Sequence, residues 1–450
     1  MVLNLPPQVN TVIEILSAAG HSAYAVGGAV RDLLRGVEPQ DWDVTTDALP
    51  EETAACFADY RVIETGLKHG TVTVLLDGMP LEITTYRLDG GYSDHRHPDS
   101  VTFTDRVEED LARRDLTINA MAYSPQRGLC DPFGGMEDLR ARRIRCVGDP
   151  MRRFDEDALR ILRAIRFAST LGFAVDPATD AAIRSGTPLL AAVSAERIFT
   201  ELRKLLCGQA AAALLRAYAD VLFFLMPALA PMRGCAQHHE RHIHDVWEHT
   251  LAAVDAVDPV PHLRLAALLH DSGKPQCRTT DAQGVDHFYG HAGASTQIAD
   301  AILRQYKTSN QLRQQVCTLV EYHDFVPHLL SRRTYRKYIH LLGEDAVRDL
   351  FRLREADLRA QNPAFLEEGL AQNAAGLAVV DALLAETPAF GLRDLAVGGD
   401  DLAAAGIPPS PAMGAILTRL LDEVQADRLK NEKDALLARA KELESGKETP

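Results

Sequence analysis

The apolar residues of the chain change their spacing once, near Asp155, and this change limits the folds that the chain can adopt. Before Asp155, short apolar runs predict strands at Tyr24–Val26, Trp42–Thr45, Thr71–Leu76 and Leu81–Tyr86. Asp77-Gly78 between the last two favours a hairpin turn, so these two strands should be antiparallel neighbours. After Asp155 the helical spacing of apolar residues predicts helices at Glu156–Thr170, Ala195–Leu206, Ala211–Leu225, Val246–Val257, Leu263–Leu269 and Ala294–Arg304. We therefore expect the α+β class, with a small mixed-sheet head followed by an elongated, all-helical remainder.

At 450 residues the chain is too long for a single hydrophobic core and should fold as several domains. We place a head at residues 1–150 and a helical neck at residues 151–235. A histidine-rich body should follow at residues 236–345, and a helical tail rich in Ala and Leu at residues 346–450.

The charge and the cysteines narrow the class of protein. A net charge of −15 argues against broad, non-specific coating of nucleic acid. Residues 140–166 depart from this average with nine arginines against four acidic residues, which suits either a local binding surface or an ordinary salt-bridged face. Seven cysteines without a CxxC pair favour free thiols in a reducing compartment. With no basic leader and no apolar run of roughly 18 residues, we expect a cytoplasmic protein without a membrane span.

Two carboxylates end a stretch near the N-terminus, VGGAVRDLLRGVEPQDWDV at residues 26–44. Asp41 and Asp43 are two apart on a predicted strand, so their side chains should point to the same face. Such a pair can hold two Mg²⁺ ions about 4 Å apart and clamp the reacting oxygens of an in-line displacement. Glu82 on the hairpin would supply a third catalytic carboxylate from a neighbouring strand. The alternative for an Asp-x-Asp pair alone is an exposed strand or turn.

The glycines at the start of the same stretch favour the catalytic interpretation. Gly27 and Gly28 allow backbone amides to approach phosphate oxygens, and Arg31 can hold a phosphate with two hydrogen bonds. Glycines, arginine and carboxylates together indicate a site for a nucleoside triphosphate with magnesium.

Three further motifs follow, RRDLTINAMAY at residues 113–123, DPFGGMEDL at 131–139 and EDALRILRAIRF at 156–167. With the first stretch they resemble, in order and spacing, the class II family of CCA-adding tRNA nucleotidyltransferases and bacterial poly(A) polymerases. The resemblance implies Mg²⁺ at Asp41 and Asp43 and tRNA contacts in the neck and tail. It also implies that the nucleotide is bound by Gly28, Arg31, Arg114, Asp157, Arg160, Arg163 and Arg166.

Asp157 and Arg160 are suited to choosing the base. On one predicted helix they lie three apart, on adjoining positions of one face. An Asp that accepts from an exocyclic amine and an Arg that donates to a ring nitrogen match cytosine and adenine, whereas uracil and guanine offer a carbonyl to the Asp. The alternative is an intrahelical ion pair. At about 100° per residue, Asp157, Arg160, Arg163 and Arg166 cannot all contact one base.

Two segments favour addition of C, C and A over addition of A alone. RVIETGLKHGTVTV at residues 61–74 lacks the basic stretch of poly(A) polymerases, and YRLDGGYSDHRHPDSVTF at residues 86–103 resembles the flexible loop of enzymes that add the final A. We expect transfer from CTP and ATP to the 3′ end of tRNA with release of pyrophosphate, and no DNA partner. A poly(A) polymerase or an A-adding enzyme is the alternative, and a regulatory RNA-binding protein with a silent head is the non-enzymatic one.

Histidines concentrate in the body, where 12 of the 16 lie between residues 238 and 340. The order of His249, His270-Asp271 and Asp324 resembles the HD superfamily of metal-dependent phosphohydrolases. Because imidazole and carboxylate together suit divalent transition metals, His287 and His291 are candidate ligands of a second metal. The resemblance implies hydrolysis of 2′,3′-cyclic phosphates and other phosphoesters. The alternative is a degenerate HD fold that is kept for its shape.

Overall fold

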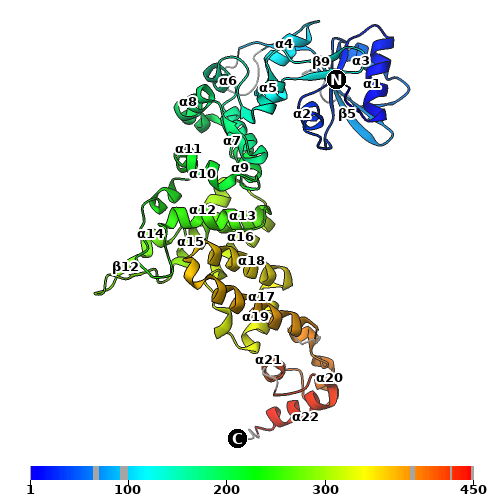
Figure 1. Cartoon of the computed structure of the whole chain (residues 1–450). Helices are drawn as coiled ribbons and strands as arrows, with labels where there is room; N and C mark the ends of the chain where they lie inside the picture. Colours follow the sequence, from blue (N-terminus) through cyan, green and yellow to red (C-terminus); the bar gives the residue numbers. More distant parts are fainter. Residues whose placement is uncertain (1, 64–69, 92–99, 386–390, 426–427, 447–450) are drawn as a thin grey trace. The chain divides into compact units, whose positions relative to one another are not determined.

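The computed structural model describes residues 2–63, 70–91, 100–385, 391–425 and 428–446. The chain forms two compact units, Met1–Pro227 and Ala228–Pro450, and each is described by itself (Figure 1). The division into four domains at residues 150, 235 and 345 stays a prediction. Among the described residues, no helix combines the length and the apolarity that a membrane crossing requires.

A seven-stranded mixed sheet organises the head, in the order β3-β4-β5-β2-β1-β8-β9. Strand β2 pairs in parallel with β5, and the other neighbours are antiparallel. The strands are β1 (Ala23–Val26), β2 (Asp43–Thr46), β3 (Arg61–Ile63), β4 (Thr71–Leu76), β5 (Met79–Thr85), β8 (Ala122–Ser124) and β9 (Gly128–Cys130). The four predicted strands and the α+β class are confirmed, although β2 begins at Asp43, so Asp41 precedes the strand.

The predicted hairpin between β4 and β5 is also confirmed. Asp77 and Gly78 have φ angles of 48° and 83°, the left-handed conformation that a tight two-residue turn between twisted strands requires. The turn pairs Leu76 with Met79 and continues the register to Thr73 opposite Glu82.

Alternation along the strands separates the apolar core from the functional face. Trp42 and Val44 are buried in an apolar cluster with helices α1 (Pro7–Ala18) and α3 (Pro50–Cys56). In β1, Ala23 and Ala25 join the same cluster, whereas Tyr24 and Val26 join a separate cluster that includes Leu111 of α4 (Val107–Ala112). Since successive side chains of a strand point to opposite faces, Asp43 points away from the first cluster.

Helices follow the sheet in the first unit, and two of the predicted ones are interrupted. They are α5 (Gly135–Arg140), α6 (Pro150–Glu156), α7 (Leu159–Leu171), α8 (Pro177–Gly186), α9 (Ala195–Leu206), α10 (Ala211–Ala217) and α11 (Ala219–Leu225). The expected helix at Glu156–Thr170 breaks at Asp157, whose backbone is extended with φ −142° and ψ 103°. The expected helix at Ala211–Leu225 breaks at Tyr218, whose hydroxyl donates to Asp180 Oδ1 at 2.7 Å.

The second unit is built from helices. These include α12 (Val246–Ala256), α13 (Pro261–Leu269), α15 (His291–Gln305), α16 (Asn310–Tyr322), α17 (Arg332–Leu342), α18 (Glu344–Ala360) and α19 (Leu366–Ala385). Towards the C-terminus α20 (Gly399–Ala404), α21 (Pro411–Gln425) and α22 (Lys433–Glu444) share a separate apolar cluster. The expectation of helices alone after Asp155 needs one correction. In the first unit β10 (Arg143–Ile144) pairs with β11 (Ala174–Val175), and in the second unit β12 (Thr279–Thr280) pairs with β13 (Asp286–His287).

Candidate functional sites

Three carboxylates gather at the start of β2. Asp43 lies directly opposite Glu82 in the parallel β2–β5 register, and Asp41 lies two residues earlier. Both aspartates are exposed while Trp42 between them is buried, so Asp41 and Asp43 share the open face that the sequence predicts. Partial loss of surrounding water raises the pKa of Asp43, Arg114 opposes this rise, and the charges of Glu82 and Asp41 add to it.

These aspartates line a cavity of about 580 Å³ within the first unit. Its wall contains residues that the sequence predicts to bind Mg²⁺ or the nucleoside triphosphate, and two of these are arginines of α7. The predicted site residues in its wall are Gly28, Arg31, Asp41, Asp43, Arg114, Arg163 and Arg166. Glu82 does not line the cavity itself but stands beside Asp43 on the next strand.

The Gly27-Gly28 turn leads from β1 into α2 (Gly28–Leu34). Gly27 has a φ of 78°, which disfavours other residues, and a β-carbon there would lie 3.0 Å from Arg114 Nη1. Desolvation lowers the pKa of Arg114, and Asp110, with Oδ2 3.6 Å from Arg114 Nη2, opposes the shift. Among the described residues Arg114 Nε is buried without a hydrogen-bond partner, a property that suits an anion-binding arginine.

One aromatic ring organises the positive wall of the cavity. The guanidinium carbons of Arg31, Arg163 and Arg166 lie 5.0, 5.6 and 3.5 Å from the centroid of the Phe167 ring. Arg31 also donates to Asn119 Oδ1 at 2.7 Å. Cation–π contacts of this kind stabilise like charges that would otherwise repel one another.

Two buried carboxylates hold the α7 arginines in place. Asp115 Oδ2 lies 2.6 Å from Arg163 Nη2, and Glu201 on α9 lies 2.8 Å from Arg166 Nε. Burial alone would raise the pKa of Asp115, but Arg163 reverses the effect and brings it to about 2. Asp115 and Asn119 were not predicted as site residues, although both belong to the motif RRDLTINAMAY, which was the available signal.

The structure corrects the geometry expected for Asp157 and Arg160. Asp157 precedes α7 and accepts from the Leu159 backbone amide at 3.1 Å, and its second oxygen pairs with Arg197 at 2.9 Å. Arg160 pairs with Glu156 Oε2 at 2.7 Å. Asp157 therefore lies outside the helix that carries Arg160, and neither residue lines the cavity.

A second polar centre lies in the second unit. Two groups of potential ligand atoms, each with all members within 4.8 Å of one another, share one aspartate. The first group is His249, His270 and Asp271, and the second is Asp271, His291 and His323. All five residues are buried. They line or adjoin a cavity of about 310 Å³.

The atoms of this centre suit a bound cation. Nε2 of His249, Nε2 of His270 and both carboxylate oxygens of Asp271 are buried without hydrogen-bond partners among the described residues. Lys274 Nζ lies 2.7 Å from Asp271 Oδ2, an ion pair without hydrogen-bond geometry, so it does not satisfy the carboxylate. Buried, unsatisfied nitrogen and oxygen donors on one cluster are typical of a metal centre.

The ligand set differs in two places from the sequence expectation. Asp324 is exposed and belongs to neither group, whereas Asp357 of α18 places Oδ1 3.0 Å from His249 Nε2 and 3.9 Å from His270 Nε2. His287 pairs with Asp281 at 2.8 Å and stacks on Tyr289, so His323 and not His287 joins His291.

Comparisons with known proteins agree with the arrangement of the head. The family model Poly A polymerase head domain matches residues 23–145, and the model tRNA nucleotidyltransferase domain 2 matches residues 279–440. A third, "Probable RNA and SrmB- binding site of polymerase A", matches residues 172–231. The CCA-adding enzyme of Levilactobacillus brevis is 36% identical over 427 residues, which cover 95% of each chain. The chain belongs to the CCA-adding enzyme family. It is a nucleotidyltransferase of tRNA processing, as the sequence predicted.

Other relatives of the chain belong to the same family. The CCA-adding enzyme of Geobacillus stearothermophilus is 50% identical over 220 residues, which are 49% of this chain and 54% of that protein. The crystal structure of the Bacillus stearothermophilus CCA-adding enzyme in complex with CTP is similar with a TM-score of 0.72 and 30% identity, covering 98% of this chain and 99% of that chain. The Thermotoga maritima CCA-adding enzyme complexed with tRNA has the same fold, with a TM-score of 0.60 at 20% identity over 98% of this chain and 96% of that chain. Membership of this nucleotidyltransferase family implies a divalent metal.

Proposed function

We propose that this protein adds C, C and A to the 3′ end of tRNA from CTP and ATP and releases pyrophosphate. The observation that carries the proposal is the cavity that joins Asp41 and Asp43 to the arginines of α2 and α7. Family membership supports the substrates. The seven free cysteines and the tRNA substrate support a cytoplasmic location.

Asp41 and Asp43, with Glu82 beside them, are the residues that would hold Mg²⁺. The donor set fits this ion, because Mg²⁺ prefers carboxylate oxygens and all three side chains offer only oxygen. When bound, magnesium activates the attacking 3′ hydroxyl and neutralises charge on the phosphates. The Gly27-Gly28 turn leaves room for phosphate oxygens next to the backbone.

The arginines have the task of binding the triphosphate. Arg31, Arg163 and Arg166 are fixed by Phe167 and by carboxylate or amide partners, so little conformational entropy is lost when they bind phosphate. Arg114 adds a desolvated guanidinium whose Nε donor has no partner among the described residues. Because phosphate contacts carry no base information, these groups serve CTP and ATP alike.

Incubation of the protein with tRNA that lacks its 3′ tail and with each labelled nucleotide tests the proposal. CTP and ATP together should extend the tRNA by C, C and A and then stop, and GTP and UTP should give little product. A long ladder of A would support a poly(A) polymerase, and extension only of tRNA that already ends in CC would support an A-adding enzyme. Absence of any extension would support the regulatory RNA-binding alternative.

The role of Asp157 and Arg160 in base choice stays a prediction. If Asp157 accepts from the base amine, Asp157→Ala should relax selectivity against UTP and GTP by about 10- to 100-fold, from roughly 1–3 kcal/mol per base contact. Arg31→Ala should instead weaken the binding of all four nucleotides alike. The measurement is kcat/KM for the four nucleotides.

Asp157→Asn is the matched variant, because its amide oxygen can still accept from the Leu159 backbone amide. If Asp157 reads the base, Asn should alter nucleotide preference. If Asp157 only holds the Leu159 amide at the start of α7, Asp157→Asn should be close to wild type and Asp157→Ala should be slower but equally selective.

The buried centre of the second unit favours a second activity, hydrolysis of phosphoesters such as 2′,3′-cyclic phosphates. The observation is that potential metal-ligand atoms of His249, His270 and Asp271 are buried without hydrogen-bond partners among the described residues. These residues with Asp357 would hold one divalent transition metal, and Asp271, His291 and His323 a second. When bound, such metals activate water for attack on phosphorus.

A further inference from the structure

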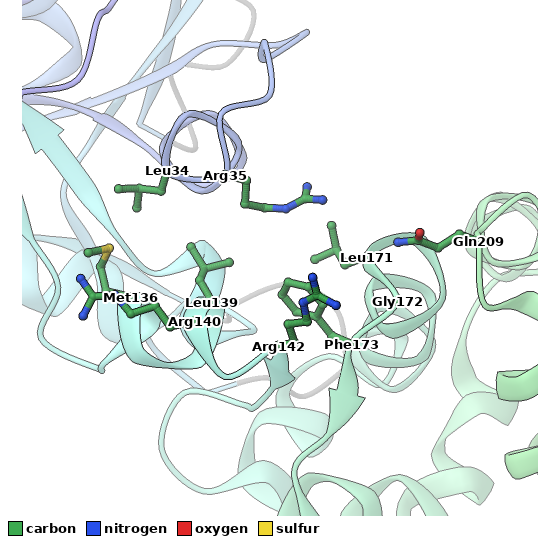
Figure 2. A pocket seen from close by; sticks show the side chains of 10 residues that line it. All are labelled: Leu34, Arg35, Met136, Leu139, Arg140, Arg142, Leu171, Gly172, Phe173 and Gln209. Carbon is green, nitrogen blue, oxygen red and sulfur yellow. The ribbon is translucent and has the colours of Figure 1, made fainter.

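A second cavity of the first unit adjoins the cavity that Asp41 and Asp43 line, which is called the catalytic cavity below. Its volume is about 610 Å³, and Arg35 and Leu171 line both cavities. Figure 2 shows Arg35 at the end of α2 and Gln209 on the opposite side, both directed towards Leu171. The two cavities are therefore neighbouring compartments on one surface.

The charge of this second cavity is positive. Arg35, Arg140 and Arg142 line it, and none of the described residues in its wall is acidic. Arg140 and Arg142 are exposed, and their side chains have no ion-pair or hydrogen-bond partner among the described residues. By contrast, Arg163 and Arg166 of the catalytic cavity are paired with Asp115 and Glu201. In a chain of net charge −15, two such arginines beside the reaction centre indicate an anionic ligand.

Apart from Gln209, the remainder of the wall is apolar. Leu171 and Phe173 are buried, and Leu34, Met136 and Leu139 are half-buried. Gly172 ends α7 with a φ of 65°, a left-handed conformation that favours glycine at this edge of the cavity. Arginine side chains around an apolar surface suit a nucleotide whose phosphate is bound and whose base or ribose packs on the protein.

We propose that this cavity, named here the acceptor subsite, binds the 3′-terminal nucleotides of the RNA acceptor strand while its last hydroxyl is at Asp41 and Asp43. The inference rests on the proposed function, since an acceptor strand is needed only if nucleotides are added to RNA. Transfer requires the 3′ hydroxyl in the catalytic cavity, so the preceding nucleotides must occupy a neighbouring surface.

The residues that line the acceptor subsite favour an RNA strand over a second nucleoside triphosphate. A triphosphate binds with its metal, and the described residues that line the acceptor subsite include no carboxylate to coordinate one. A phosphodiester carries one charge per nucleotide and needs no metal, which matches isolated arginines. The other occupant, a free nucleotide, would change the KM for CTP instead of the KM for tRNA.

The double variant Arg140→Ala/Arg142→Asn tests the acceptor subsite. Asn suits position 142 because Arg142 has a φ of 50°, a left-handed conformation that Asn tolerates. We expect the KM for tail-less tRNA to rise about tenfold, with kcat at saturating tRNA and the KM for CTP within about twofold of wild type. The logarithm of the tRNA-binding constant should also fall less steeply with the logarithm of the salt concentration, by about 0.7 in slope for each phosphate that the variant no longer binds.

Arg61→Ala is the matched control, because Arg61 is an exposed arginine on the edge strand β3 that lines neither cavity. A double variant whose KM for tRNA equals that of Arg61→Ala overturns the inference. So does an equal rise in the KM for CTP, which would place a nucleotide and not the acceptor strand in the cavity.

Binding of CTP and the melting temperature report whether the variant is folded. If the wild-type protein extends no tRNA, the proposed function fails; if it extends tRNA and the variants match the control, the subsite alone fails.

Discussion

Asp43→Asn should lower the rate of nucleotide addition at least about 1,000-fold while leaving the fold intact. Asparagine has nearly the size of aspartate but removes a negative ligand from the expected magnesium site. A loss of this size corresponds to about 4 kcal/mol of transition-state stabilisation. Asp41→Asn should act in the same way, since Asp41 shares the open face of Asp43. The measurement is single-turnover addition of CTP to tail-less tRNA.

The control for this prediction is Asp59→Asn, an exposed aspartate of the head that lines neither cavity of the first unit. It should keep wild-type activity, which separates the loss of a ligand from a general loss of charge. Retention of activity within tenfold by both Asp41→Asn and Asp43→Asn would contradict the assignment of the carboxylates. Glu82→Gln then shows whether the neighbour of Asp43 on β5 takes part.

Local signals were sufficient to predict that Asp41 and Asp43 share one open face. Burial of Trp42 and exposure of Asp41 and Asp43 follow from the alternation of a strand, even though β2 begins only at Asp43. The hairpin at Asp77-Gly78 brings Glu82 into the sheet, and its turn chemistry is visible in two residues. Parallel pairing of β5 with β2 is a long-range contact, and it places Glu82 next to Asp43.

The break before α7 could not be predicted in the same way. Apolar spacing continues through residues 156–170, so periodicity alone predicts one helix. The break lies at Asp157, which accepts from the Leu159 amide at the start of α7 and from Arg197, 40 residues later in the chain. The grouping of three arginines around Phe167 is likewise a tertiary feature, because Arg31 comes from α2 and the other two from α7.

The polar centre of the second unit also contains contacts that sequence periodicity does not predict. His323 and Asp324 are adjacent at the end of α16, and a rotation of about 100° per residue decides which one faces Asp271. The structure selects His323, and a further carboxylate comes from Asp357 on α18. The structure brings His249, His270, Asp271 and His291 of the sequence motif together, and their role as metal ligands stays a prediction.

His270→Ala with Asp271→Ala should abolish phosphoester hydrolysis and metal binding in the second unit. Asp271 belongs to both ligand groups, so its loss removes a ligand from each metal position. Hydrolysis of a 2′,3′-cyclic nucleotide should become undetectable, and the content of bound transition metal, measured by mass spectrometry, should fall to background. Addition of C, C and A should stay within about twofold of wild type, because the catalytic cavity lies in the other unit.

His287→Ala is the matched control, because His287 lines the same cavity but belongs to neither ligand group. It should keep the bound metal, as should Asp324→Ala, whereas Asp357→Ala should lose part of it.

Addition of CCA by the double variant shows that the protein is folded. If the double variant keeps its metal, the centre is not a metal site. If metal is bound but no phosphoester is cleaved even by the wild-type protein, the second unit has kept the HD shape without the activity. If hydrolysis and addition vanish together in a folded protein, the two sites are not independent.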